Sequence, residues 1–375
     1  MKRGAKSDFE NRIAQKRIAA QGISGAKFEK PEDVVRWMGA VQAQDYLGSL
    51  WGIGLRLAHA TERDVEQAIA ERRIIRTWPM RGTLHFVPAD DVRWMTTLLA
   101  PRVVSRNAGR LKRDYGIDPN VLARSGRILS RALEGGKRLT REGIYKALGA
   151  GGGSANSGVG LHIVWWLAQE GLLCLGPREG KQQTFVLLDE WMPGSRLVDR
   201  EEGLASLAMR YFTSHGPATV RDFAWWTGLP LGEATRCVTS VKDQLAREVF
   251  EEQEYWSGAT TDSRFHTAVH LLPAFDEFTV GYTDRTANVH PTYQRRGVIG
   301  FGIMSPVVVA GAQVIGPWRR KIANGRVTIV VGKETLLKKK ELAMLKVVAE
   351  KYGGFLKRPV TVNVPSQRGP RYGVR

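Results

Sequence analysis

The sequence predicts an α+β protein in which three tandem winged-helix modules precede a β-rich C-terminal domain. Three helix patterns and a hairpin pattern follow one another between residues 119 and 187, which is the element order of a winged helix. Residues 218–241 are typical of a helix-turn-helix, and strand patterns dominate from about residue 267. At 375 residues the chain is too long for one ordinary core, so we expect units at residues 1–118, 119–198, 199–262 and 263–375.

The charge balance predicts a polyanionic partner. Lysine and arginine total 56 against 37 acidic residues, which gives a formal net charge of +19 and a pI of about 10.1. Such an excess repels itself in the compact state, and phosphate backbones are the commonest partners that neutralise it. An anionic membrane surface is the weaker alternative, because the chain lacks a long basic amphipathic helix with exposed aromatic residues.

Composition also indicates where the protein works. No apolar run reaches the roughly 18 residues that a membrane span needs, and the basic N-terminal stretch has no apolar core of a secretory signal. We therefore expect a cytoplasmic protein. Cys174 and Cys237 lie among apolar neighbours and are too few for a disulfide framework or a zinc site, so we expect reduced core thiols.

The first unit is organised around the segment Gln42-Ala43-Gln44. Apolar residues recur at spacings of three and four on both sides of it, which predicts two amphipathic helices joined by a short break. Because alternate side chains lie on the same side of an extended segment, the break directs both amides to one side. Asp45 can end the break as the N-cap of the second helix. By spacing alone, this is also an ordinary polar junction between helices.

Two further features of the first unit carry basic residues. Residues 76–87 predict a wing-like hairpin that Arg76, Arg81 and His85 would decorate. Beyond Pro101, the arginines fall on one face of a helix, with no acidic residue four positions away until Asp114. This stripe is either a solvated helix face or a set of phosphate contacts; it consists of Arg102, Arg106, Arg110 and Arg113.

The second unit predicts a helix over residues 121–133, a short helix opening at Leu139-Thr140-Arg141, and a third helix before a hairpin. The glycine-rich stretch at residues 149–160 lacks the Gly-Lys-Ser/Thr ending of a phosphate loop, so we expect a helix-connecting loop. The hairpin turn falls at residues 177–181, and its basic, polar tip at Lys181 and Gln182 suits a DNA groove or backbone.

The third unit repeats the theme. Thr219 is a predicted N-cap, residues 228–230 form a turn, and residues 231–241 form a second helix with Arg236 exposed. Its Ala218-Thr-Val-Arg-Asp resembles Leu139-Thr-Arg-Glu of the second unit, which indicates tandem copies of one module, the first copy being more diverged.

The remainder predicts four strands and a closing helix, over residues 268–275, 306–310, 313–318, 327–331 and 334–352. Asp276, Glu277 and Asp284 are either acids at strand ends or, as we favour, structural partners of Arg285. His266 and His270 lie on a predicted strand, where residues four apart are about 13 Å from each other, so no metal site is expected.

Five segments in order resemble the AlkZ-like bacterial DNA glycosylases: VQAQDYLGSLWGIGLRL, RTWPMRGTLHFVPADD, GKQQTFVLLDE, LLPAFDEFTVGYTDR and SPVVVAGAQVIGPWRRK. The resemblance implies three winged helices with a barrel-like tail around a basic channel. It also implies excision of alkylated purines and unhooking of interstrand crosslinks. The family's catalytic signature is glutamine, an apolar residue, then glutamine or aspartate, which Gln42 and Gln44 match.

This chemistry is plausible in its own right. An N7-alkylated purine is positively charged and leaves readily, so the enzyme has to place a water and stabilise a cationic sugar. Glutamine carbonyls can do both without ionising. Asp45 is a rival base, ranked second because its expected capping role would keep it hydrogen-bonded. We therefore expect a monofunctional glycosylase without metal or cofactor.

The expected partner is double-stranded DNA with alkylated purines, bound by a monomer in the nucleoid without an obligate protein partner. The alternatives are a winged-helix transcription regulator without catalysis and, more weakly, a non-catalytic protector that sequesters lesions or toxins. The candidate DNA contacts are Arg76, Arg81, His85, Arg102, Arg106, Arg110, Lys181, Gln182, Arg319 and Arg320.

Overall fold

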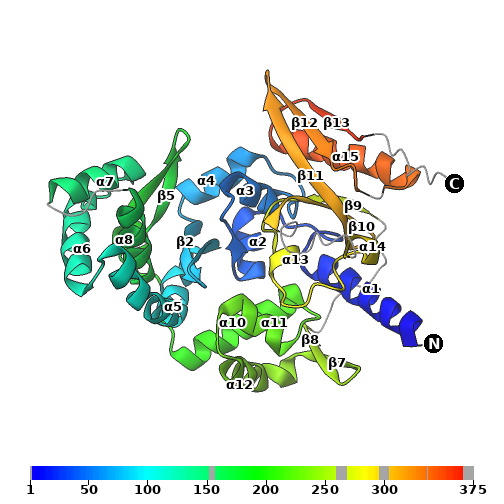
Figure 1. The fold of residues 1–375 in the computed structure, drawn as a ribbon, viewed down its shortest axis with the longest axis horizontal. Coiled ribbons are helices and arrows are strands. Elements are labelled where there is room, and N and C mark those ends of the chain that lie inside the picture. Colours follow the sequence, from blue (N-terminus) through cyan, green and yellow to red (C-terminus); the bar gives the residue numbers. More distant parts are fainter. Residues whose placement is uncertain (1, 152–156, 259–267, 295–303, 336, 366–375) are drawn as a thin grey trace, which may run out of the picture.

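The computed structural model describes residues 2–151, 157–258, 268–294, 304–335 and 337–365 of this mixed α+β chain. Figure 1 shows the second unit on the left, the third at the bottom and the C-terminal sheet with its helix on the right, around the helices and strands of the first unit. None of the described helices is long and apolar enough to cross a membrane. Cys174 and Cys237 are free and buried, as predicted.

The first unit contains the two predicted helices around the glutamine motif, the capped helix after them and the hairpin. Asp64 and Thr61 form a capping box at the start of α4. Helix α5 runs unbroken through Pro101, with Gly116 in the left-handed conformation at its end. The elements are α1 (Lys2–Ala20), α2 (Pro31–Met38), β1 (Val41–Gln42), α3 (Tyr46–Gly54), α4 (Glu62–Ala70), β2 (Ile74–Met80), β3 (Thr83–Pro88), the 3₁₀ turn η1 (Ala89–Asp91) and α5 (Val92–Tyr115).

The second unit has the predicted three helices and hairpin. Side-chain caps explain two helix starts, because Asp118 accepts a hydrogen bond from the backbone of Val121 and Thr140 from that of Gly143. The hairpin turn is shorter than predicted, since the strands pair as far as Glu179 and Gln182. The elements are α6 (Pro119–Leu133), β4 (Leu139–Thr140), α7 (Arg141–Ala150), α8 (Ser157–Gln169), β5 (Leu173–Glu179), β6 (Gln182–Leu187) and α9 (Leu188–Trp191).

The third unit confirms the predicted pair of helices. Thr219 caps α11 in a capping box with Asp222, and Gly228, at φ +79°, takes the left-handed conformation that ends it. A hairpin that the sequence pattern did not reveal follows. The elements are α10 (Arg200–His215), α11 (Val220–Thr227), α12 (Leu231–Val241), the 3₁₀ turn η2 (Lys242–Gln244), β7 (Ala246–Phe250) and β8 (Gln253–Ser257).

The C-terminal region is an open, curled sheet in the order β13-β12-β11-β10-β9, covered by α15. The four predicted strands are present, but β11 extends further than expected, α15 begins later, and β13, parallel to β12, was not predicted. The elements are β9 (Val269–Leu272), α13 (Glu277–Val280), α14 (Pro291–Gln294), β10 (Val307–Ala310), β11 (Gln313–Ala323), β12 (Arg326–Val331), α15 (Lys339–Phe355) and β13 (Val360–Asn363).

The hairpins of the first two units join in one six-stranded sheet, in the order β1-β3-β2-β5-β6-β4. Arg76 of β2 pairs with Leu175 of β5, and every residue of β2 is buried. The hairpin predicted at residues 76–87 is therefore present, but strand pairing on both sides places it in the middle of a sheet.

The hydrophobic clusters cross the predicted unit boundaries. Trp51 of α3, only 2% exposed, packs edge-on against Tyr352 of α15 at 4.9 Å and donates its ring N–H to the carbonyl of Leu271 in β9 at 2.7 Å. Burial of a ring this large contributes on the order of a few kcal/mol. The first unit and the C-terminal sheet thus share one core. The boundaries at residues 118, 198 and 262 stay predictions.

Candidate functional site

The Gln42-Ala43-Gln44 motif lies at the edge of the six-stranded sheet. Gln42 of β1 pairs with His85 of β3, and the backbone N–H of Ala43 donates to the carbonyl of Leu84 at 2.8 Å. This extended backbone, between α2 and α3, is the break that the sequence predicted. The strand β1 ends at Gln42 and the chain bends at Gln44, so the convergence of the two glutamine side chains stays a prediction.

The two glutamines differ in their surroundings. Gln42 is 8% exposed, and its side-chain oxygen Oε1 is buried without a hydrogen-bond partner among the described residues. Gln44 is exposed, and its Oε1 accepts a hydrogen bond from the backbone N–H of Leu84 at 3.0 Å. A buried acceptor without a partner costs about 1–3 kcal/mol and calls for a functional explanation. Gln42 thus supplies an acceptor that the described part of the chain leaves unused.

Asp45 occupies the N-cap position of α3 but does not cap it with its side chain. Its backbone is extended, and no side-chain capping bond forms. Its carboxylate lies over the first turn instead, since a methyl group built on Gly48 would come within 2.5 Å of Asp45 Oδ2. The predicted N-cap position is confirmed, but the side-chain hydrogen bond expected with it is not formed. That bond was the reason for ranking Asp45 behind the glutamines.

The side chain of Glu277 binds the backbone of the glutamine motif. This residue of α13, 1% exposed, accepts hydrogen bonds from the backbone N–H of Gln42 at 2.8 Å, from Trp226 Nε1 at 3.0 Å and from His215 Nε2 at 3.4 Å. Burial by itself raises the pKa of Glu277, but the hydrogen bond from His215 and the charge of Arg81 outweigh it and hold the pKa at about 2. A buried carboxylate anion thus lies directly beneath Gln42.

Sequence reasoning singled out the acids near Glu277 but assigned them the wrong partner. Asp276 forms a buried pair with both terminal nitrogens of Arg56, at 2.9 and 3.0 Å. Arg285 instead donates to the carbonyl of Thr279. The structural interpretation holds for Asp276, but the link from Glu277 to Gln42 joins residues 235 positions apart, and no local pattern signals it.

His85 lies on the Gln42 side of the sheet, because directly paired residues of an antiparallel ladder share a face. Arg81 lies in the β2–β3 turn and contacts His85. His85 donates from Nδ1 to the carbonyl of Thr83 at 2.9 Å, so its Nε2 accepts from Arg81 Nη2 at 3.4 Å. Burial, and then the charge of Arg81, lower the pKa of His85 to about 4. At neutral pH the imidazole is uncharged, and Arg81 is the cation next to it.

Arg76 supports the motif from within the sheet. It is 4% exposed and donates from Nε and Nη2 to the carbonyl of Ala43, at 3.2 and 2.6 Å, and from Nη1 to Gln183 Oε1 of β6. Burial lowers the pKa of Arg76 to about 10, so it remains charged. The prediction that Arg76 and His85 decorate the hairpin is wrong, since both side chains lie inside the protein. Their contact with DNA stays a prediction.

The other candidate DNA contacts lie on the surface in separate places. Arg102, Arg106 and Arg110 are exposed on α5, Lys181 and Gln182 are exposed at the tip of β5–β6, and Arg319 is exposed on β11. Arg320 is half-buried and donates to the hydroxyl of Tyr352 at 2.6 Å. Their contacts with DNA stay predictions.

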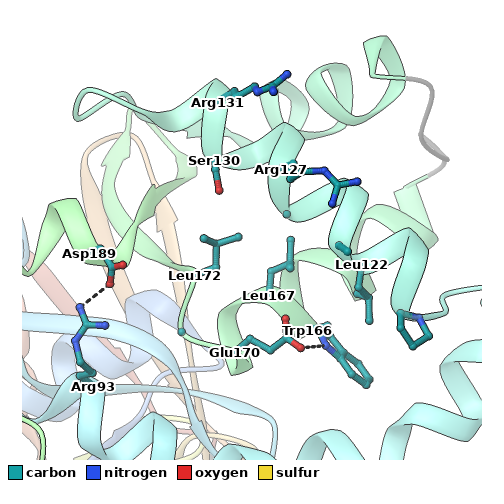
Figure 2. A pocket seen from close by; sticks show the side chains of 14 residues that line it. Arg93, Leu122, Arg127, Ser130, Arg131, Trp166, Leu167, Glu170, Leu172 and Asp189 are labelled. Atoms are coloured by element: carbon teal, nitrogen blue, oxygen red, sulfur yellow. Dashed lines mark hydrogen bonds and ion pairs between the residues drawn. The ribbon is translucent and has the colours of Figure 1, made fainter.

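A cavity of about 810 Å³ lies away from the motif, between α6 and α8 (Figure 2). Arg93 and Asp189 pair across part of its wall at 2.6 Å, and Trp166 donates to Glu170 at 2.7 Å. These two pairs occupy four of its polar side chains, and the glutamine motif does not line it. Within the described part of the chain, no three His, Cys, Asp or Glu residues are grouped to hold a metal; His266 lies outside it.

Comparisons with known proteins agree with the resemblance of the motifs. A family model described as DNA glycosylase AlkZ-like matches residues 35–355. A relative named interstrand DNA cross-link repair glycosylase, from Streptomyces sahachiroi, is 27% identical over 308 residues, which are 76% of this chain and 81% of that protein. The solved structure of Streptomyces sahachiroi DNA glycosylase AlkZ shares the fold, with a TM-score of 0.73 at 23% identity over 94% of this chain and 98% of that one. The chain belongs to the AlkZ-like DNA glycosylase family.

Proposed function

We propose that this protein is a DNA-repair glycosylase that hydrolyses the N-glycosidic bond of N7-alkylated purines in duplex DNA and unhooks interstrand crosslinks formed through such purines. The observation that carries the proposal is the buried Oε1 of Gln42, which has no partner among the described residues and lies two residues before the exposed Gln44. The relative's name, an interstrand cross-link repair glycosylase, supports the crosslink substrate. The alternative of a regulator without catalysis is not favoured by family membership.

The proposed reaction divides between the two glutamines. The free acceptor of Gln42 holds the attacking water or faces the cationic sugar as the bond to the base breaks. Gln44 Oε1 keeps one lone pair after accepting from Leu84, so it remains able to accept from the same water. The alkylated base leaves as a neutral purine, with the electron pair of the glycosidic bond neutralising its positive charge.

Two opposite charges lie near the motif, and they act in opposite directions on a cationic transition state. Arg81 is close enough to lower the pKa of His85, and its positive charge opposes an oxocarbenium-like sugar. The anion of Glu277 compensates on the other side of the motif backbone. Asp45 remains a second candidate for the base, because no capping bond occupies its carboxylate.

We further propose that the first three units are winged-helix modules that enclose a basic channel for DNA. The order of α6, β4, α7, α8, β5 and β6 in the second unit supports this, as do α10 to α12 with the β7–β8 hairpin in the third. The net charge of +19 supports DNA as the partner. On this proposal the enzyme is monofunctional, needs no metal and works as a monomer on nucleoid DNA.

The decisive experiment is a single-turnover assay on a duplex containing one N7-methylguanine, with abasic sites measured by alkaline cleavage. The parent protein should form abasic sites, and the Gln42→Ala/Gln44→Ala double variant should not do so above background while it binds the duplex normally. A second arm uses an N7–N7 interstrand crosslink and measures strand separation. A parent that binds both duplexes but forms no abasic sites contradicts the proposal, and a fully active double variant moves the chemistry to Asp45.

A further inference from the structure

A cavity of about 420 Å³ lies between the middle of α5, the turn joining α11 to α12, the start of α10 and the β2–β3 turn. Four arginines line it, and we refer to Arg81, Arg102, Arg106 and Arg200 as the arginine pocket. They come from the first and third units, which are far apart in the chain. The sequence pattern grouped only two of them, Arg102 and Arg106, in its stripe.

The arginine pocket carries unbalanced positive charge. Four arginines line the cavity with one acidic residue, Glu233, which pairs with Arg200. Arg102 and Arg106 are exposed, and neither forms an ion pair with another described residue. Arg102 and Arg106 lie four positions apart on one helix face, where like charges repel one another. The arrangement therefore favours a state in which an anion lies among the arginines.

The chemistry of the pocket fits a phosphodiester. Planar guanidinium groups bind two phosphate oxygens at once, and a concave site with apolar walls strengthens that attraction relative to open solvent. Leu98 and Leu99 supply such a wall. Arg81 is half-buried and oriented by hydrogen bonds to the carbonyl of Trp225 and to His85. These bonds use two of the five N–H groups of its guanidinium, so the others can donate to a phosphate.

The arginine pocket is also connected to the glutamine motif. Arg81 donates to His85, and His85 pairs across the strands with Gln42. A phosphate held on Arg81 would therefore fix the position of a DNA strand relative to Gln42. It would also neutralise the cation that otherwise opposes a positively charged sugar.

We propose that the arginine pocket binds one backbone phosphodiester of the DNA strand that carries the lesion; the assignment of that strand rests on the proposed glycosylase function. The phosphate comes from a nucleic acid backbone rather than from free phosphate, because the pocket is open to exposed arginines along α5 and its volume exceeds that of a single phosphate ion.

The first test measures binding of an undamaged duplex as a function of salt, which does not depend on excision. The Arg102→Gln/Arg106→Gln variant should lower the slope of log affinity against log salt by about one, because both arginines serve one phosphate. The control Arg127→Gln/Arg131→Gln changes two exposed arginines on α6, away from the pocket. An equal loss in the control, or none in the pocket variant, overturns the proposal; melting temperatures verify that both variants fold.

The second test locates the phosphate. Duplexes with a tetrahydrofuran abasic analogue carry a neutral methylphosphonate at one linkage at a time near the analogue. With the parent, neutralising one linkage should lower the affinity about tenfold. This loss should be smaller in the Arg102→Gln/Arg106→Gln variant, since its pocket has already lost two of its four arginines. Equal costs at that linkage in both proteins overturn the proposal.

A third arm separates the two sources of phosphate. Inorganic phosphate, compared with chloride at equal ionic strength, should leave the melting temperature of the parent unchanged in the millimolar range. Stabilisation that the pocket variant loses would instead assign the pocket to free phosphate and overturn the backbone assignment. If the salt and linkage results hold while the parent forms no abasic sites, the glycosylase proposal fails and the phosphate site stands.

Discussion

The hairpins β2–β3 and β5–β6 look alike in sequence and differ in their surroundings. Both are antiparallel pairs with a glycine in a tight turn and basic residues nearby. β2 is paired on both sides and buried along its whole length, whereas the tip of β5–β6 is exposed and projects from the body of the fold (Figure 1). We refer to β2–β3 as the inner hairpin and to β5–β6, with its exposed tip, as the outer hairpin. Burial restricts the basic residues of the inner hairpin to contacts within the protein.

On the inner hairpin, polar residues hold the motif in place. Arg76 binds the carbonyl of Ala43, the backbone of Leu84 holds the side chain of Gln44, and His85 pairs with Gln42. On the outer hairpin, Lys181 and Gln182 contact solvent. The same kind of residue therefore holds the glutamine motif in one hairpin and is exposed to solvent in the other, because buried polar groups must pair within the protein.

The largest expected effect belongs to Gln44, which the inner hairpin positions. Gln44→Ala should slow excision roughly 100- to 1,000-fold, or about 2.7–4 kcal/mol, because it removes a hydrogen-bonding group from the place where charge develops. Gln44→Asp should keep partial activity, since a carboxylate still accepts from water. Single-turnover rates on N7-methylguanine duplex give the numbers, and unchanged duplex affinity is the control. Parent-like excision by the alanine variant would remove Gln44 from the mechanism.

The next effect is a loss of stability at acid pH, caused by the buried His85 of the inner hairpin. The pKa of His85 is lowered to about 4 in the fold, below its ordinary value of 6.5, so the unfolded chain takes up a proton first as pH falls. The contribution of His85 to the free energy of unfolding should therefore be nearly constant well above pH 6.5. It should fall by roughly 2–3 kcal/mol by pH 4.5. Denaturant titrations at pH 7 and 4.5 measure the loss.

His85→Asn should remove most of this loss, and the same change at the exposed His59 should not. His215 is also buried with a lowered pKa and acts in the same direction, so a smaller acid sensitivity remains. Glu277 does not contribute in this range, because its pKa of about 2 keeps its stabilisation in place until the pH falls below about 4.5. An unaltered pH dependence in His85→Asn would show that the buried imidazole is not responsible.

A smaller effect distinguishes buried from exposed arginines. Arg76→Met should cost about 1–3 kcal/mol in the free energy of unfolding, because it leaves the carbonyl of Ala43 and the amide of Gln183 without their donor. The salt dependence of DNA binding should not change. Arg110→Met on the exposed face of α5 is the matched variant, with a reduced salt slope and parent-like stability expected. A reduced salt slope in Arg76→Met would show that Arg76 contacts DNA despite its burial.

The smallest effect on stability is expected at the outer hairpin. Lys181→Ala should change the free energy of unfolding by less than about 0.5 kcal/mol, because an exposed turn contributes little to folding. Its salt slope for duplex binding should fall by about one, and Lys181→Arg should restore it. Chemical denaturation and binding titrations test both points. A collapse in stability would make this tip structural, like the inner hairpin.

Short-range chemistry in the sequence determined much of the local structure. Thr219 and Gly228 predicted the limits of α11, and the spacing of apolar residues predicted α2 and α4. The extended Gln42-Ala43-Gln44 break was predictable for the same reason. Caps, left-handed glycines and helical periodicity depend on neighbours within four residues, so they can be read without knowing the rest of the fold.

Tertiary structure alone decided which polar residues face solvent and which surround the motif. An interior and an edge strand have the same local pattern, so the burial of Arg76 followed only from the pairing of β2 with β5, and that of His85 from the position of β3 between β1 and β2. The carboxylate of Glu277 reaches Gln42 from 235 residues away, and the arginine pocket assembles side chains from two units. Such contacts depend on the packing of the whole chain, because charge and burial are properties of a place in the fold and not of a stretch of sequence.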